Sequence, residues 1–435
     1  MCRTCSTMRI CRTKTKKTTE RSNQRRRYPR KGAGGVLFEE KEKPMGLSER
    51  LTACLEEAVA NHEAAGISLL VLRDGGELCY AQAGKADIAA GKPVARDSIF
   101  RLYSQTKPIT AAAVMILADR GIIDLMACVD QYLPGFRNPR VVNPDGSVVP
   151  ALRAPMILEL LTMTAGLCYP DADPAGQYAA RVFGENQEQI QAGGGMSTME
   201  FCNRLGEQPL AFQPGTGWRY SSCADILGAL VEAADGRRFG QFLKNELFEP
   251  LGMKDTAFWV PEEKKDRLVT CYRRIPGGLE EFRNLHLAVG RYDREPAFES
   301  GGAGLVSTLD DYAAFAGMLL NNGVHEGKRI LSPAAVRFMT APRLNPEIRR
   351  NLWDSLCGYN YGCLVRVCDR PESCGIFNEK GEYGWDGWLG TYFANMPGRR
   401  ISFLLNQNAP DTGTAAVTRK CRNILASALS LEGEC

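Results

Sequence analysis

The run Ser104-Gln105-Thr106-Lys107 opens a mostly apolar stretch that continues to Arg120 and is followed by Gly121. This pattern predicts a helix over 104–120, because a glycine commonly ends a helix and the apolar residues need a core to pack against. Residues three apart lie on the same face of a helix, so Lys107 can reach the hydroxyl of Ser104. Ser104 would lie at the N-terminal end, where free backbone N–H groups and the helix dipole favour developing negative charge.

A serine activated at this place needs a group that takes its proton. The chain has three histidines, and none lies in a motif for a catalytic triad or for a histidine-ligated metal. Lys107 is placed to act instead, although a lysine titrates near 10.4 in water and must be desolvated or lie beside positive charge to serve as a base. The Ser-x-x-Lys spacing is weak by itself, since a chain of this length holds about one or two by chance. The alternative is a helix cap followed by a surface lysine.

Two further runs carry groups suited to the same chemistry. Tyr220-Ser221-Ser222 precedes a predicted helix over 225–234, and a tyrosine there can carry a proton if a neighbouring lysine lowers its pKa from about 10. The run Tyr383-Gly384-Trp385-Asp386-Gly387-Trp388-Leu389-Gly390-Thr391 is spaced by glycines and enters a predicted strand. An edge strand beside the nucleophile can donate a backbone N–H to an oxyanion, and glycines let a substrate approach closely.

In this order, the three runs resemble those of the serine β-lactamases and penicillin-binding proteins. The nearest resemblance is to the class C-like branch, which includes family VIII carboxylesterases and D-stereospecific peptidases. Similar motifs extend over about residues 47–430. They are Leu160-Leu161-Thr162-Met163-Thr164-Ala165-Gly166-Leu167, Pro250-Leu251-Gly252-Met253-Lys254-Asp255-Thr256, Ser300-Gly301-Gly302-Ala303-Gly304-Leu305-Val306-Ser307-Thr308 and Gly358-Tyr359-Asn360-Tyr361-Gly362.

The resemblance implies an α/β fold, with an antiparallel sheet flanked by helices and an inserted, mainly helical lobe. Within a hydrolase domain over 45–435, the sheet lobe would take in about 45–125 and 295–435, and the helical lobe about 126–294. Ser104 would attack the acyl carbon, while Lys107 and Tyr220 would move the proton between Ser104, leaving group and water. The backbone N–H groups of Ser104 and Trp388 would form the oxyanion hole, with no metal or cofactor.

Two departures from the family pattern bear on the substrate. Ser222 replaces the usual asparagine and is a shorter donor, and Trp385-Asp386-Gly387 stands where β-lactamases have Lys-Thr-Gly or His-x-Gly. Trp385 cannot hold a substrate carboxylate and Asp386 would repel one, so these residues are expected to bind a small ester that is hydrolysed through an acyl-enzyme. The alternatives are a D-aminopeptidase or amidase whose ammonium substrate contacts Asp386, a β-lactamase-type hydrolase, an acyltransferase and a non-catalytic ligand sensor. Plain packing is the other interpretation of Trp385 and Trp388.

Hydrophobic periodicity predicts elements on both sides of the Ser104 helix. Strands fall near both ends of the chain, whereas residues from about 125 to 295 are expected to form helices and long loops rich in glycine and proline. The expected helices are 47–62, 225–234, 309–321, 332–340 and 415–431, and the expected strands are 66–71, 77–84, 363–368, 390–395 and 401–406.

Charge is concentrated in a basic tail. Residues 1–31 carry twelve lysines or arginines and one acid, a charge of +11 that leaves −7 for the rest of a chain of net charge +4. The tail is expected to be disordered. Lys41-Glu42 can be encoded as AAG-GAG, a bacterial ribosome-binding sequence, so translation is expected to begin at Met45 and to leave 1–44 untranslated. A mitochondrial transit peptide or a nucleic-acid-binding arm are the alternatives.

The rest of the composition limits the kinds of partner that the protein can bind. No apolar run approaches the roughly 18 to 20 residues that cross a bilayer, and the body has no basic stripe for a nucleic acid. The sixteen cysteines are scattered, and Cys357, Cys363, Cys368 and Cys374 match no metal motif. They are expected to be reduced thiols of a cytoplasmic protein. The expected partner is therefore a small ester or amide, without nucleic acid or membrane.

Overall fold

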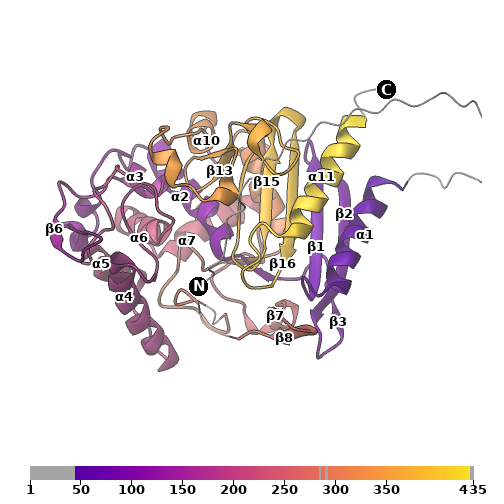
Figure 1. Cartoon of the computed structure of the whole chain (residues 1–435), viewed down its shortest axis with the longest axis horizontal. Helices are drawn as coiled ribbons and strands as arrows, with labels where there is room; N and C mark the ends of the chain where they lie inside the picture. The colour runs from indigo at the N-terminus through magenta and orange to yellow at the C-terminus, as the bar shows by residue number, and fades with distance from the viewer. Residues whose placement is uncertain (1–44, 284–285, 290–291, 432–435) are drawn as a thin grey trace, which may run out of the picture. The chain divides into compact units, whose positions relative to one another are not determined.

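The computed structural model describes residues 45–283, 286–289 and 292–431, so the expected basic tail over 1–44 lies outside the described residues. An antiparallel sheet of eight strands runs in the order β12-β13-β14-β15-β16-β1-β2-β3 (Figure 1). Three of the strands come from the N-terminal part and five from the C-terminal part. Their bounds are β1 Gly66–Arg73, β2 Gly76–Asp87, β3 Lys92–Pro93, β12 Tyr359–Tyr361, β13 Arg366–Cys368, β14 Tyr383–Asp386, β15 Tyr392–Met396 and β16 Ile401–Gln407.

Strands from the two parts of the chain meet at the centre of this sheet. β1 pairs with β16 over seven residues, from Ile67 opposite Gln407 to Arg73 opposite Ile401. Side chains alternate across a strand. Leu69 of β1 therefore packs with the helices α1 (Leu47–Ala60) and α11 (Ala416–Leu431) on one face, and Leu70 packs into the larger core on the other. Figure 1 shows α1 and α11 together at one end of the sheet.

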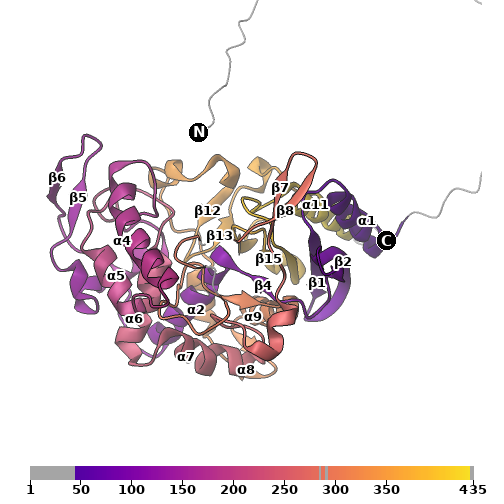
Figure 2. The ribbon, with the colours of Figure 1, turned by 90° about the horizontal axis from the view of Figure 1, so that it is seen from below.

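The helix that carries Lys107 lies in the core on the opposite face. It is α2 (Thr106–Asp119), and all twelve residues from Thr106 to Leu117 are buried, as expected for a helix that is apolar all round. It contacts β14 as well as α6 and α10. The other helices, most of which form the helical region of Figure 2, are α3 Ile157–Leu161, α4 Pro174–Gln191, α5 Thr198–Gly206, α6 Cys223–Asp235, α7 Phe239–Leu243, α8 Glu249–Leu251, α9 Leu309–Leu320 and α10 Pro333–Met339.

Four short two-stranded pairs lie outside the main sheet. They join β4 to β9, β5 to β6, β7 to β8 and β10 to β11. Their bounds are β4 Phe100–Arg101, β5 Arg140–Val142, β6 Val148–Pro150, β7 Tyr272–Ile275, β8 Gly278–Glu281, β9 Val306–Ser307, β10 Val324–His325 and β11 Lys328–Arg329. Among the helices of the described ranges, none is long and apolar enough to cross a membrane.

Two sequence expectations need correction here. β14 is not an edge strand, because it lies between β13 and β15. The strand expected over 363–368 begins only at Arg366. Leu364 has a φ of 56°, outside the extended range, and the N–H groups of Cys363 and Leu364 donate to Met339 and Leu161 rather than to a strand.

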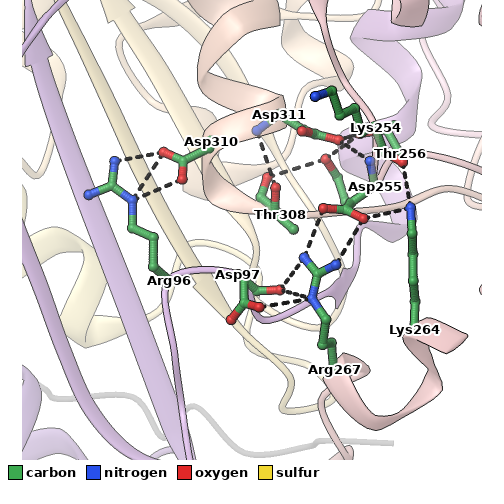
Figure 3. A network of polar contacts seen from close by, with 11 residues as sticks. Arg96, Asp97, Lys254, Asp255, Thr256, Lys264, Arg267, Thr308, Asp310 and Asp311 are labelled. Atoms are coloured by element: carbon green, nitrogen blue, oxygen red, sulfur yellow. Dashed lines mark hydrogen bonds and ion pairs between the residues drawn. The ribbon is translucent and has the colours of Figure 1, made fainter.

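The family-like runs 250–256 and 300–308 meet in a polar network at the start of α9 (Figure 3). The Asp255 carboxylate pairs with Arg267 and Lys264, each at 2.8 Å. The Asp311 carboxylate accepts from the backbone N–H of Asp255 at 2.7 Å and from the Thr256 hydroxyl at 2.9 Å. These contacts join the loop after α8 to α9, so the run 250–256 has a structural role in this protein.

Asp311→Ala is expected to lower the free energy of unfolding by about 1 to 3 kcal/mol, because it leaves the part-buried N–H of Asp255 and the buried hydroxyl of Thr256 without this acceptor. Asp310→Ala is the matched control. Its side chain is 52% exposed and pairs with Arg96 on the surface, so its loss should cost less than about 1 kcal/mol. Urea unfolding of both variants measures the difference. Equal losses would show that the Asp311 contacts add nothing to those of an exposed ion pair.

Candidate active site

The residue that precedes Ser104 holds an unusual backbone conformation. Tyr103 has a φ of 46°, which is uncommon for a residue with a side chain, and it begins the 3₁₀ turn Tyr103–Gln105 that leads into α2. Its buried ring packs against Trp388 with centroids 5.2 Å apart. Ser104 therefore lies in a tight turn just before α2 rather than in its first turn, and it remains half-buried.

The amine of Lys107 is fully buried and has three hydrogen-bond partners. Its Nζ lies 3.2 Å from the Ser104 hydroxyl, 3.0 Å from the Tyr169 hydroxyl and 2.9 Å from the carbonyl oxygen of Gly302. A neutral amine has two N–H donors and one lone pair. With Tyr169 and Gly302 accepting the two N–H groups, the lone pair is left for the proton of Ser104.

The charge state of Lys107 is set by its burial. Burial lowers the pKa of Lys107 to about 7, against the attraction of the Asp225 carboxylate. Asp225 is itself buried and accepts hydrogen bonds from the Ser300 hydroxyl at 2.5 Å and from the N–H of Gly302 at 3.0 Å. Gly302 thus connects the two groups, because its carbonyl bonds to Lys107. A substantial fraction of the amine is therefore neutral near pH 7.

Tyr220 lies beside both Ser104 and Lys107. Its ring centroid is 4.6 Å from Nζ of Lys107, and its hydroxyl accepts from Nε1 of Trp385 at 3.1 Å. Burial raises the pKa of Tyr220, although hydrogen bonds with Ser104 and Trp385 act in the opposite direction. The lowered pKa suggested by the sequence is thus wrong in sign. Tyr220 is a neutral phenol near pH 7 and is suited to donate a proton.

The turn after β14 approaches the chain just before Ser104. A Cβ atom on Gly387 would lie 2.1 Å from the carbonyl oxygen of Leu102, so only glycine fits there without a shift, and the Thr391 hydroxyl donates to the same oxygen at 3.0 Å. Among the described residues, no acceptor bonds to the backbone N–H of Ser104 or of Trp388. Both groups are therefore free to donate to a ligand.

Two of the residues expected to bind substrate, Ser222 and Trp385, are buried. Ser222 is fully buried, and its hydroxyl donates to the carbonyl oxygen of Cys168 at 3.1 Å, so its donor is already used within the protein. Trp385 is 2% exposed and its indole N–H is bonded to Tyr220. The residue that takes the place of the family's lysine or histidine therefore orients the tyrosine.

The expected repulsion by Asp386 also needs correction. Its carboxylate pairs with Arg366 at 2.7 Å, and the Arg366 side chain is only 3% exposed. This ion pair neutralises Asp386, so the carboxylate neither repels an anionic substrate strongly nor offers a free charge to an ammonium group. The side chain of Trp388 is used in packing, since it stacks on His286 at 4.2 Å and donates to Asp411 at 2.7 Å.

Three residues of the site were missed by the sequence reasoning. Tyr169 bonds to Lys107, Asp225 bonds to Gly302 beside it, and Arg366 bonds to Asp386. Each of the three comes from a different segment of the chain. The only usable signals were that Tyr169 follows the run 160–167 and that Asp225 begins the predicted helix after Tyr220. No signal pointed to Arg366. Within the described ranges, no group of three or more His, Cys, Asp or Glu side chains could hold a metal ion.

Comparison with known proteins matches the chain to one family. A family model described as Beta-lactamase matches residues 51–426. The chain belongs to the β-lactamase family. Esterase EstB of Burkholderia gladioli is 32% identical over 387 residues, which cover 84% of this chain and 92% of the relative. Acyltransferase calJ of Penicillium decumbens is 28% identical over 372 residues, which cover 79% and 84%.

A solved structure of the family agrees with the fold. EstCE1, a hydrolase with promiscuous acyltransferase activity, aligns with a TM-score of 0.71 and 25% identity, over 88% of this chain and 98% of its own. The α/β fold and the family that the sequence predicted are thus confirmed. The family match and the esterase relatives identify this β-lactamase family member as a serine hydrolase.

Proposed function

We propose that this protein hydrolyses small esters through an acyl-enzyme formed on Ser104. The observation that carries the proposal is the buried amine of Lys107, which lies 3.2 Å from the Ser104 hydroxyl and has a pKa lowered to about 7. Such an amine can accept a proton at neutral pH, which an exposed lysine cannot. The similarity to Esterase EstB supports an ester as the substrate.

Each group of the site has a role in this reaction. The neutral amine of Lys107 accepts the proton of Ser104 as Oγ attacks the acyl carbon, and the N–H groups of Ser104 and Trp388 stabilise the oxyanion. Tyr220 donates its proton to the departing alkoxide, and the proton held by Lys107 then neutralises the phenolate beside it. Water then attacks the acyl carbon and gives a proton to Lys107, and that proton passes to Oγ of Ser104 as its bond to the acyl group breaks and the acid leaves.

The pairing of Asp386 with Arg366 supports an ester rather than an amide or a β-lactam. A β-lactam or a D-Ala-D-Ala peptide presents a carboxylate, and holding it requires a donor or a positive charge. Arg366 is the cation next to Trp385, on the neighbouring strand β13. Its side chain already bonds to Asp386. For the same reason Asp386 has no free charge for the ammonium group of an aminopeptidase substrate.

Acyl transfer is the second candidate. The names of EstCE1 and calJ include this activity, and it would use the same acyl-enzyme with an alcohol in place of water. The ratio of alcoholysis to hydrolysis products, measured in the presence of a competing alcohol, separates the two candidates.

The rate of ester hydrolysis is expected to depend on the protonation of Lys107. Only the neutral amine accepts the proton of Ser104, so kcat/KM should rise with pH through about 7 and fall by up to about tenfold per pH unit below it. Labelling of Ser104 by a fluorophosphonate should follow the same profile, because it needs the same base. A flat profile between pH 5 and 8 for both reactions would contradict this role of Lys107.

Substrate preference is expected to favour neutral esters. With p-nitrophenyl butyrate and nitrocefin as substrates, kcat/KM for the ester should exceed that for the β-lactam by at least about tenfold, since Arg366 is already bonded to Asp386 and is not free to hold the carboxylate. Trp385→Lys should raise the ratio of β-lactam to ester turnover. Equal turnover of the two substrates by the wild type would contradict the proposal, and absence of fluorophosphonate labelling would favour a non-catalytic ligand sensor.

We propose a cytoplasmic location, in which the twelve cysteines of the described part stay free thiols as the structure has them. We also propose that the hydrolase domain is residues 45–435, with the lobes divided near residues 126 and 294. The partner is a small-molecule ester, without nucleic acid or membrane.

A further inference from the structure

One tryptophan beside the catalytic tyrosine is exposed to solvent. All five tryptophans of the chain lie in the described ranges, and of these only Trp353 ranks as exposed, at 46%. An exposed indole is unusual, because tryptophan is well buried on average. The position of this residue in the fold connects it to the reaction.

Trp353 lies between two 3₁₀ turns, Ile348–Asn351 and Asp354–Leu356. Its ring meets Tyr220 with centroids 4.8 Å apart and an interplanar angle of 62°, and it meets Trp218 at 5.4 Å and 85°. Both are edge-to-face geometries, which aromatic pairs favour. The N–H of Trp218 donates to the side chain of Asn351 at 3.4 Å, so the segment is also held against the loop that carries Tyr220 by a hydrogen bond.

The same indole lines an open cavity of about 760 Å³. Leu344, Leu352 and Leu356 contribute apolar surface to the lining. Arg349 and Asp369, which also line it, pair with each other at 2.6 Å and so neutralise one another. Trp353 therefore contacts the catalytic tyrosine and also borders this cavity, which is lined by neither Ser104, Lys107 nor Tyr220.

The reaction places one particular part of the substrate beside Tyr220. In the mechanism proposed above, Tyr220 gives its proton to the oxygen of the departing alcohol, so the carbon group on that oxygen must lie next to Tyr220. Of the other aromatic rings around Tyr220, Trp218 at 5% exposure and Trp385 at 2% are buried, and Tyr169 is partly buried with its hydroxyl bonded to Lys107. Trp353 is the most exposed ring among these neighbours.

We propose that Trp353 binds the alcohol part of the ester and makes the enzyme prefer esters of alcohols that carry an aromatic ring over esters of short alkyl alcohols. The inference rests on the proposed esterase function and adds the substrate class. An aromatic contact of this kind corresponds to roughly 3- to 10-fold in kcat/KM. Trp353 acts on binding alone, because its indole N–H can donate a hydrogen bond but does not exchange a proton near neutral pH.

The test uses two esters that share the acyl group and the type of leaving group. Ethyl butyrate and 2-phenylethyl butyrate both release a primary alcohol, and they differ by one phenyl ring. Trp353→Ala should lower kcat/KM for 2-phenylethyl butyrate by roughly 3- to 10-fold and leave ethyl butyrate within about twofold. Trp353→Phe should restore the ring preference. Hydrolysis of the shared butyryl-enzyme should be unchanged in both variants.

Phe377→Ala is the matched control, because Phe377 is an aromatic residue with 64% exposure whose backbone N–H bonds to Asn423 of α11. It should not change either ester. An equal loss for both esters in Trp353→Ala would overturn the proposal, since it would show that the indole only supports Tyr220, and so would no change for either. Failure of the esterase function itself is distinct: mass spectrometry of the wild type would then show no butyryl group on Ser104, and the inference would fall with it.

Discussion

Ser104→Ala is expected to reduce ester hydrolysis on the order of 10⁶-fold, the loss seen when another serine hydrolase loses its nucleophile. The reason is chemical: alanine has no oxygen to form the acyl-enzyme, and the other groups of the site act on that oxygen. Labelling by a fluorophosphonate should disappear at the same time. The fold should persist, because the replacement removes one half-buried hydroxyl. Rate assays and mass spectrometry of labelled protein measure both effects, and thermal unfolding checks the fold.

Ser222→Ala is the matched control for this experiment. Ser222 lies after Tyr220 in the chain, but its buried hydroxyl bonds to a backbone carbonyl. We expect labelling and hydrolysis to remain within a few-fold of wild type, with a stability loss of about 1 kcal/mol for the hydrogen bond. Retained turnover in Ser104→Ala would exclude the assignment of the nucleophile. Loss of labelling in Ser222→Ala would restore this residue as part of the site.

Lys107→Met is the second change with a large expected effect. Methionine has a similar length but no group that takes a proton, so kcat should fall by about 10² to 10⁴-fold, the usual contribution of a positioned acid–base group. Folding should survive, because the new side chain suits a fully buried position in α2. Activity assays with the same butyrate esters measure the loss.

The pH dependence of unfolding gives an independent check on this residue. Its folded pKa, about 7, is below the value of 10.5 that applies when unfolded, so between these values the unfolded chain binds more protons than the folded one. The wild type should therefore gain stability as pH rises from about 7 to 10, by up to about 1.4 kcal/mol per pH unit relative to Lys107→Met. Parallel curves for the two proteins would mean that the lysine is not desolvated, whatever the activity of the variant.

Local patterns were sufficient to predict that Ser104 and Lys107 lie together, but not what surrounds them. Ser104 and Lys107 are three residues apart, so the spacing alone indicates that they can meet. The partners of Lys107 come from Tyr169 and Gly302, which lie 62 and 195 residues away in the chain. Such contacts depend on how whole elements pack, and a single sequence holds no local sign of them.

The direction in which a side chain points could not be predicted from the sequence either. The position of Ser222 after Tyr220 indicates nearness to the site, yet its hydroxyl faces the carbonyl of Cys168. Asp386 is an acid next to the site in the sequence, and only the sheet reveals Arg366 on the neighbouring strand β13 as its partner. By contrast, the helix at 47–62 and the hairpin at 66–84 follow from periodicity and a turn sequence, and the structure has both.

The pairing of β1 with β16 has a consequence for how the protein is made. The two strands form seven residue pairs, but roughly 330 residues separate them in the chain. At the usual rate of synthesis, β1 waits tens of seconds on the ribosome before its partner emerges. During that time the hairpin β1–β2 exposes apolar faces that β16 and α11 help to cover in the folded protein. The nascent chain is therefore expected to need a chaperone, and hydrolytic activity should appear only after release of the complete polypeptide.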